Sequence, residues 1–116
     1  MHKFLIIEDC TTCAYLISAI IQQAVIDADI RYATTLDEAI PQISTMDIVI
    51  TDYDFPDKGF PALLPVLQKE QCQFILQSAN YDCIKSYDPI LQLGAIRKDI
   101  NFTAQLLQLL KNVVAL

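Results

Sequence analysis

Short apolar runs alternate with longer segments of helical spacing along the whole chain. The apolar runs, which we expect to be strands, occupy residues 3–7, 30–33, 47–51, 73–77 and 95–97. The segments whose apolar residues recur at helical spacing occupy residues 12–25, 36–44, 60–69, 82–93 and 102–114. The strands are apolar throughout, which is typical of parallel strands covered on both faces. The pattern therefore predicts an α/β protein in which a parallel five-stranded sheet lies between two layers of helices.

The second expected helix carries both a start signal and a disturbance. Thr35 and Glu38 have the spacing of a capping box, in which the two residues satisfy free N–H groups at the start of a helix. Pro41 lies inside the same segment and lacks a backbone N–H group. We therefore expect this helix to be short or kinked.

Acidic residues directly follow two of the expected strands. Glu8 and Asp9 follow the first strand, and Asp52 follows the third, with Asp54 close behind. In a flavodoxin-like sheet of strand order 2-1-3-4-5, the first and third strands are neighbours and sites form beyond their carboxyl ends. We therefore expect the carboxylates of Glu8, Asp9 and Asp52 to share one crevice. Such a group either shares protons, with raised pKa values, or holds a hard divalent cation, for which Mg²⁺ is the natural choice.

Length and composition limit the classes of protein to consider. The chain has 116 residues, which predicts one domain over residues 1–116. It is 53% hydrophobic, yet no apolar run approaches the ~18 residues of a membrane span, and the opening is too short for a signal peptide. We therefore expect a soluble cytoplasmic protein. The net charge is −6 and the eight basic residues are scattered, which argues against direct binding of nucleic acid.

Four segments together resemble the receiver domain of two-component response regulators. They are "FLIIED" at the start, "DIVITDYDFPDKGF" in the middle, "FILQSA" at the fourth expected strand and "IRKD" near the end. The resemblance covers essentially the whole chain in order and spacing. It implies a phosphoacceptor aspartate at Asp52, a Mg²⁺-binding pair at Glu8 and Asp9, a hydroxyl at Ser78 and a lysine at Lys98. It also implies that the backbone carbonyl of Asp54 is a metal ligand.

The resemblance assigns each of these residues a role in phosphoryl transfer. Asp52 would accept the phosphoryl group from a histidine kinase or a phosphotransfer protein, in a reaction that the domain itself catalyses. Lys98 would bind one phosphoryl oxygen, and Ser78 with the backbone N–H of Ala79 would bind another. In such a reaction the protein mainly positions groups and neutralises charge.

Three departures from the family pattern concern how phosphorylation is transmitted. Ala95 occupies the position of the usual aromatic residue of the fifth strand, and Asp99 stands where a proline is common. The turn before the third helix is one residue shorter than usual and contains Lys58 and Gly59. We expect a local adjustment at this turn, and a readout that differs from the usual rearrangement.

The cysteines support an alternative of another class. Cys10 and Cys13 form a Cys-x-x-Cys pair where a strand leads into a helix, the place where a thiol redox pair sits. Against this alternative, Glu8 and Asp9 should raise the pKa values of both thiols. A zinc site made with Cys72 and Cys83 is a weaker alternative, because these two lack the close pairing of structural zinc sites. A third alternative is a pseudo-receiver that binds partners without turnover.

The chain ends with the last expected helix, so we expect its signal to leave by contact with a downstream protein. The segments 12–26 and 102–116 are apolar over more than one stripe. Leu106, Leu107 and Leu109 cannot all face one sheet. Such surplus apolar surface suggests a homodimer or a partner groove, and a thick core with a few exposed leucines is the alternative.

Overall fold

The structure is a computed structural model that describes residues 2–56, 58–80, 82, 85, 87 and 93–114, and for 113 and 114 the backbone alone. Its five strands are β1 (His2–Ile7), β2 (Ala28–Ala33), β3 (Ile48–Asp52), β4 (Gln73–Ser78) and β5 (Ala95–Arg97). The helices assigned in this part of the chain are α1 (Thr11–Ala24), α2 (Leu36–Ile43), α3 (Phe60–Lys69) and α5 (Phe102–Val114). The helix predicted over 82–93 lies mostly outside the described residues.

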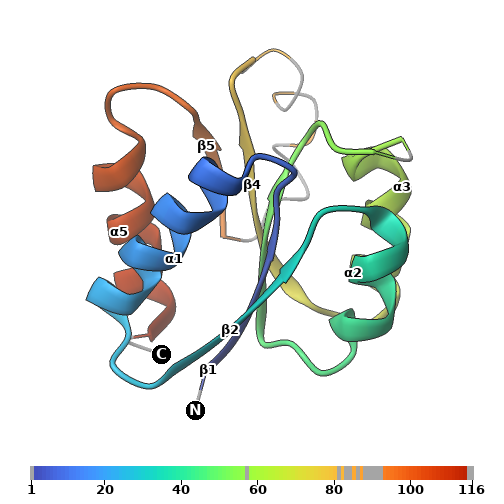
Figure 1. Ribbon diagram of the computed structural model, residues 1–116, viewed down its shortest axis with the longest axis horizontal. Helices are drawn as coiled ribbons and strands as arrows, with labels where there is room; N and C mark the ends of the chain where they lie inside the picture. The colour runs from blue at the N-terminus through green and yellow to red at the C-terminus, as the bar shows by residue number, and fades with distance from the viewer. Residues whose placement is uncertain are drawn as a thin grey trace.

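The strands form one parallel sheet in the order β2-β1-β3-β4-β5. Helices α1 and α5 cover one face, and α2 and α3 cover the other (Figure 1). This is the flavodoxin-like three-layer sandwich that the sequence predicts. Because β1 and β3 pair directly, with Ile7 opposite Thr51, the residues that follow them are brought together at one edge.

Apolar side chains of the strands fill both faces of the sheet. Phe4 and Ile6 of β1 pack in the core beneath α1 and α5, and Leu5 and Ile7 pack in the core beneath α2 and α3. All four are fully buried. Successive side chains of a strand point to opposite faces, so a strand buried on both sides must be apolar at every position. Burial of the strands on both faces therefore explains why they appear in the sequence as continuous apolar runs.

The second helix agrees with its sequence signals. The backbone N–H of Glu38 donates to Oγ1 of Thr35 at 3.2 Å, so Thr35 caps the first turn. The helix has eight residues with Pro41 inside it. The prediction of a short helix is therefore confirmed.

The shortened turn before α3 uses two residues in the left-handed region. Lys58 has φ 75° and Gly59 has φ 62°. A Cβ atom on Gly59 would lie 2.5 Å from the carbonyl oxygen of Tyr53, so a side chain has no room there. The same carbonyl accepts a hydrogen bond from the N–H of Phe60 at 3.0 Å. This close contact folds the segment after Asp52 back over the end of β3, which is the expected local adjustment.

Helix α5 buries its apolar residues more completely than the sequence suggests. Leu106 and Leu110 are fully buried, and Leu107 and Leu109 are half-buried against the same core. These leucines therefore favour a thick core over a free apolar face. Exposed apolar side chains occur instead on α1, where Tyr15 is 67% and Leu16 48% exposed.

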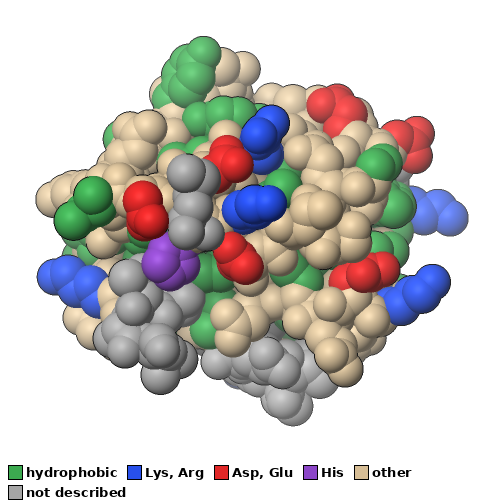
Figure 2. Space-filling view, turned by 90° about the horizontal axis from the view of Figure 1, so that it is seen from below, with side chains coloured by type: hydrophobic (Ala, Val, Ile, Leu, Met, Phe, Trp, Pro, Cys, Tyr) green, Lys and Arg blue, Asp and Glu red, His purple; other side chains and the backbone are tan. Residues whose placement is uncertain are grey.

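Charged side chains of both signs are mixed on the face that carries His2 (Figure 2). The basic side chains do not gather into a stripe on this face. Among the described helices, none has the length and apolar character that a membrane crossing requires.

Candidate functional site

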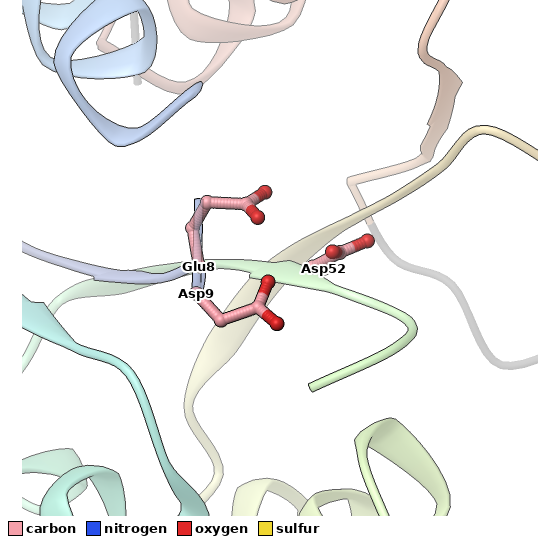
Figure 3. Close-up of side chains that lie close together, drawn as sticks. All are labelled: Glu8, Asp9 and Asp52. Atoms are coloured by element: carbon pink, nitrogen blue, oxygen red, sulfur yellow. The ribbon is translucent and has the colours of Figure 1, made fainter. Parts of the chain in front are cut away.

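Three carboxylates meet beyond the carboxyl ends of β1 and β3. Glu8 and Asp9 follow β1 directly, and Asp52 is the last residue of β3. One oxygen atom from each of the three lies within 4.8 Å of the others (Figure 3). Glu8 and Asp52 are buried and Asp9 is exposed. The structure thus brings together the three acids that the sequence predicts, at the strand pair where the sheet order reverses.

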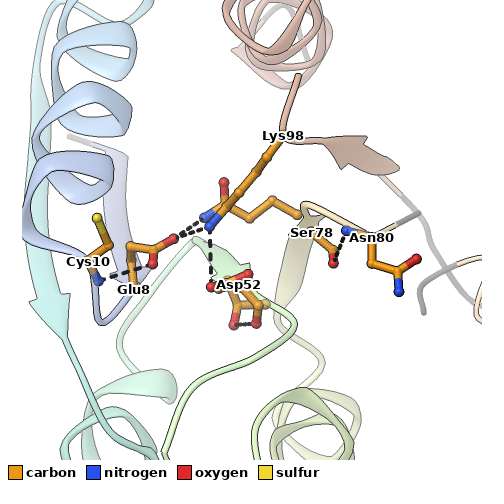
Figure 4. Close-up of polar contacts among 8 residues, drawn as sticks. Glu8, Cys10, Asp52, Ser78, Asn80 and Lys98 are labelled. Atoms are coloured by element: carbon orange, nitrogen blue, oxygen red, sulfur yellow. Dashed lines mark hydrogen bonds and ion pairs between the residues drawn. The ribbon is translucent and has the colours of Figure 1, made fainter. Parts of the chain in front are cut away.

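Lys98 reaches this cluster from the end of β5. Its Nζ atom lies 2.8 Å from Oε2 of Glu8 and 3.3 Å from Oδ2 of Asp52 (Figure 4). The backbone N–H of Lys98 donates to the carbonyl of Ser78 at 2.8 Å, and this hydrogen bond holds the backbone of Lys98 beside the end of β4. One ammonium group therefore bridges carboxylates from two strands.

Burial changes the pKa values of the charged groups in the cluster. Desolvation raises the pKa of Glu8 and of Asp52, although Lys98 opposes the rise in both. Burial alone would lower the pKa of Lys98, but its hydrogen bond to Glu8 and the charge of Asp52 raise it overall. When ionised, three carboxylates and one ammonium leave two negative charges uncompensated. The cluster therefore favours additional positive charge.

The donor set of the cluster fits a hard divalent cation. Glu8, Asp9 and Asp52 supply carboxylate oxygens, which Mg²⁺, Mn²⁺ and Ca²⁺ accept. The exposed position of Asp9 leaves room for the water molecules that Mg²⁺ retains. The predicted role of the Asp54 carbonyl stays a prediction; the backbone of Asp54 does lie close enough to the Asp52 carboxylate to lower its pKa.

Ser78 ends β4 next to the acidic cluster. It is buried, and its Oγ accepts a hydrogen bond from the N–H of Asn80 at 3.0 Å. Because this bond uses a lone pair, the hydroxyl proton remains available as a donor. In the register of β3 and β4, Asp52 lies opposite Gln77, so Ser78 is one position beyond Asp52. Ala79 follows and is exposed, as a group that binds an incoming oxygen must be.

Gln77 is a part of the site that sequence reasoning missed. Its side chain is fully buried, and its Nε2 donates to Oε2 of Glu8 at 3.3 Å. Glu8 also accepts from the N–H of Cys10 at 3.2 Å and from Lys98, so both of its oxygens are held. Within the described structure, Oε1 of Gln77 has no hydrogen-bond partner. The feature of the sequence that could have identified Gln77 is its position as a glutamine after the apolar residues of the run "FILQS".

A small cavity lies beside Lys98 on the α1 and α5 side of the sheet. Its volume is about 160 Å³. Its lining is mostly apolar, with Leu16, Ile17 and Phe102, and it also includes Cys13 and Gln77. Lys98 therefore has open space on one side and the carboxylates on the other.

The two cysteines at the start of α1 differ in their chemistry. The backbone N–H of Cys13 and its thiol lower the pKa of Cys10, and the hydrogen bond to Cys10 raises the pKa of Cys13. The charge of Glu8 raises the pKa of both thiols, as expected, but the pKa of Cys10 is lowered overall because the hydrogen bonds from Cys13 outweigh this effect. The N–H groups at a helix start stabilise a thiolate more than the charge of Glu8 destabilises it.

Cys72 lies at the opposite edge of the sheet. It precedes β4, its Sγ donates to the carbonyl of Met46, and burial raises its pKa to about 11. Cys10 follows β1 at the carboxyl edge, so these thiols cannot share one zinc ion. Cys83 lies outside the described residues.

Aromatic side chains pack beside Ala95 although β5 itself contributes none. Tyr87 contacts Phe60 edge-on, with ring centroids 5.1 Å apart, and Tyr53, with centroids 6.0 Å apart. Ala95 packs against the same core cluster. Tyr53, Tyr87 and Ala95 therefore pack against one apolar cluster.

Comparison with solved structures shows the fold of the chain. A response regulator receiver domain from Rhodospirillum rubrum aligns with a TM-score of 0.80 at 18% identity, over 98% of this chain and 94% of its own. One from Clostridium thermocellum aligns with a TM-score of 0.80 at 18% identity, over 99% and 95%. A response regulator protein from Burkholderia pseudomallei, with a phosphorylated aspartic acid, calcium ion and citrate, has a TM-score of 0.71 at 16% identity, over 99% and 72%.

These neighbours share the fold that response regulator receiver domains adopt, and they cover nearly the whole chain. No family model and no curated protein matches the sequence. The chain therefore has the receiver-domain fold, at a sequence identity of 18% to these two neighbours.

Proposed function

We propose that the protein is a response-regulator receiver domain that accepts a phosphoryl group on Asp52. The observation that carries this proposal is the position of Lys98, whose Nζ bridges Glu8 and Asp52 beside the buried hydroxyl of Ser78. An acceptor carboxylate, a mobile cation and a hydroxyl donor are the groups that phosphoryl transfer to a carboxylate requires. The donor in this proposal is a histidine kinase or a phosphotransfer protein.

Residues of this chain act on each group that takes part in the proposed transfer. An oxygen of Asp52 attacks phosphorus in line with the bond to the donor nitrogen, which breaks as the acylphosphate forms, and the nitrogen keeps the electron pair. Lys98 leaves Glu8 and binds a phosphoryl oxygen through its Nζ, and Ser78 donates its hydroxyl proton in a hydrogen bond to another. Ala79 contributes its backbone N–H. Hydrolysis of the acylphosphate then restores Asp52.

Mg²⁺ is the cofactor in this proposal. Glu8, Asp9, Asp52 and the backbone carbonyl of Asp54 would hold the ion, which supplies positive charge against the phosphoryl oxygens. The B. pseudomallei neighbour, which contains a phosphorylated aspartic acid and a calcium ion, supports both the modification and a divalent cation in this fold.

The output of the proposed receiver is contact with a downstream protein in the cytoplasm. Asp52 and the segment that folds back at Gly59 lie at the carboxyl edge of the sheet, where a change at the site alters the surface. Tyr15 and Leu16 on α1 are exposed apolar residues that fit a partner or a second copy.

Intact-mass spectrometry after incubation with acetyl phosphate and MgCl₂ tests the proposal. We expect the gain of one phosphoryl group, which Asp52→Asn and EDTA both abolish. Because a short-lived acylphosphate can escape detection, binding of beryllofluoride is measured in parallel. Absence of both the adduct and beryllofluoride binding contradicts the proposed function and favours a pseudo-receiver.

A further inference from the structure

The proposed phosphoryl transfer does not use the side chains of Cys10 and Cys13, which lie beside the carboxylate cluster. Cys10 is the residue that precedes α1, and Cys13 is the third residue of the helix. Side chains at these two positions meet across the first turn, as they do in a capping box. Cys10 is exposed and Cys13 is half-buried, so a reagent in solution reaches Cys10 first.

The geometry of this first turn permits a disulfide bond. Cys10 is the N-cap residue of α1, with φ −92° and ψ 113°, and Cys13 is the third residue of the helix. A disulfide requires Cβ atoms about 4 Å apart, and the side chains at the N-cap and third helical positions face each other across the first turn, as in a capping box. Figure 4 shows the sulfur atom of Cys10 pointing toward the first turn of α1 and away from the carboxylate of Glu8. The thiol is thus directed to its partner and not to the metal ligands.

We infer that Cys10 and Cys13 form a reversible disulfide by exchange with a low-molecular-weight disulfide, and that this bond controls the affinity of the carboxylate cluster for divalent cations. The bond itself does not depend on the proposed function. Its effect on cation binding does rest on the cation site of that proposal.

The exchange balances as two substitutions at sulfur. Sulfur of Cys10, having lost its proton, attacks one sulfur of oxidised glutathione and displaces one glutathione thiol as a mixed disulfide forms. Sulfur of Cys13, having lost its proton, then attacks the sulfur of Cys10 and displaces the second glutathione. Two protein thiols are oxidised, one glutathione disulfide is reduced, and excess reduced glutathione reverses both steps.

The disulfide would act on the site through two contacts. The N–H of Cys10 donates to Oε1 of Glu8 at 3.2 Å, so the position of Cys10 helps to fix that carboxylate. Cys13 lines the cavity of about 160 Å³ that Lys98 and Gln77 also line. A bond between Cys10 and Cys13 links the turn that follows β1 to α1. The bond reduces the conformational entropy of this turn, which cation binding would otherwise have to reduce. Preorganised ligands bind more tightly, so the oxidised protein should bind cations more strongly.

Peptide mapping tests whether the bond forms. The folded protein is equilibrated with oxidised and reduced glutathione, free thiols are alkylated, and trypsin releases residues 4–31, which contain both cysteines. We expect this peptide to lose two hydrogen atoms and to resist alkylation, in wild type and in the matched control Cys72→Ser. In Cys13→Ser we expect a glutathione adduct on Cys10 instead. A wild-type protein in which Cys10 keeps its glutathione adduct, or in which both thiols remain free, overturns the inference.

Calorimetric titration with MgCl₂ tests the effect of the bond. We expect oxidised wild type to bind Mg²⁺ about threefold more tightly than reduced wild type, or more. The affinity of the double variant Cys10→Ser/Cys13→Ser, which can form neither the disulfide nor a glutathione adduct at this turn, should be the same with and without oxidant. Equal or weaker binding by the oxidised wild type overturns the coupling. Absence of Mg²⁺ binding in both forms contradicts the proposed function instead, and peptide mapping still decides whether the disulfide exists.

Discussion

Lys98 and Glu8 lie 90 positions apart in the sequence, yet Nζ of the lysine is 2.8 Å from Oε2 of the glutamate. The glutamate side chain is almost completely buried, and the lysine is 22% exposed. The pair therefore joins the residues that follow β1 and β5, the first and last strands in the sequence, at the point where we propose phosphoryl transfer. In the proposed reaction Lys98 exchanges this contact for a phosphoryl oxygen, so the contact would have a cost for function as well as a benefit for folding.

Replacing Lys98 tests how much the pair stabilises the fold. Lys98→Ala leaves the buried carboxylate of Glu8 without its cation, so we expect the free energy of unfolding at pH 7 to fall by roughly 3 kcal/mol. Urea denaturation measures the change. The exposed Lys69→Ala serves as the control and should stay within about 0.5 kcal/mol of wild type. A Lys98→Ala protein as stable as wild type would show that the pair contributes nothing.

Cation binding should appear as thermal stabilisation. Millimolar MgCl₂ should raise the melting temperature, because an ion that binds only the folded state stabilises it by mass action. Asp9→Ala should abolish the increase without unfolding the protein, because Asp9 is exposed. Glu70→Gln, an exposed change after α3, should keep it. If Asp9→Ala keeps the full increase, the cation binds elsewhere.

The raised pKa of Asp52 predicts how stability depends on pH. The folded protein binds the proton of Asp52 more tightly than the unfolded chain does. Protonated Asp52 therefore contributes to the free energy of unfolding below the ordinary aspartate pKa, and this contribution is lost as the pH rises through the pKa of Asp52 in the folded protein. We therefore expect Asp52→Asn to be more stable than wild type in metal-free buffer at pH 7. The difference should shrink on acidification and on addition of MgCl₂. Urea denaturation across pH 4 to 7 measures it, and a difference that is independent of pH would argue against this cause.

Gln77 provides a prediction with a matched pair of variants. Gln77→Glu keeps the shape but sets a second carboxylate against Glu8, so we expect a loss of about 2 kcal/mol or more at pH 7. Gln77→Leu removes the bond to Glu8 together with an unpaired buried oxygen, and should change the free energy of unfolding by less than about 1 kcal/mol. Chemical denaturation compares the two. Equal effects would mean that volume, and not charge, matters at this position.

The sequence predicted the acidic cluster because its members follow strands directly and the strand order is set by a general rule. Glu8, Asp9 and Asp52 need no information beyond the ends of two apolar runs. Gln77 could not be assigned in this way, because its partner lies 69 positions away and a polar residue inside a strand does not reveal which charge it meets. The lowered pKa of Cys10 was missed because it depends on the direction of N–H groups in the first turn of α1.

The carboxylate of Glu8 would also link the proposed phosphorylation to folding. It follows β1 and is held by Gln77 of β4 and by Lys98, which follows β5. Because β3 lies between β1 and β4, the site is complete only when β1, β3, β4 and β5 have assembled. A chain that is half-folded, newly synthesised or locally opened would lack a competent acceptor. Only fully folded molecules would then be phosphorylated, and a misfolded molecule would not activate a downstream protein.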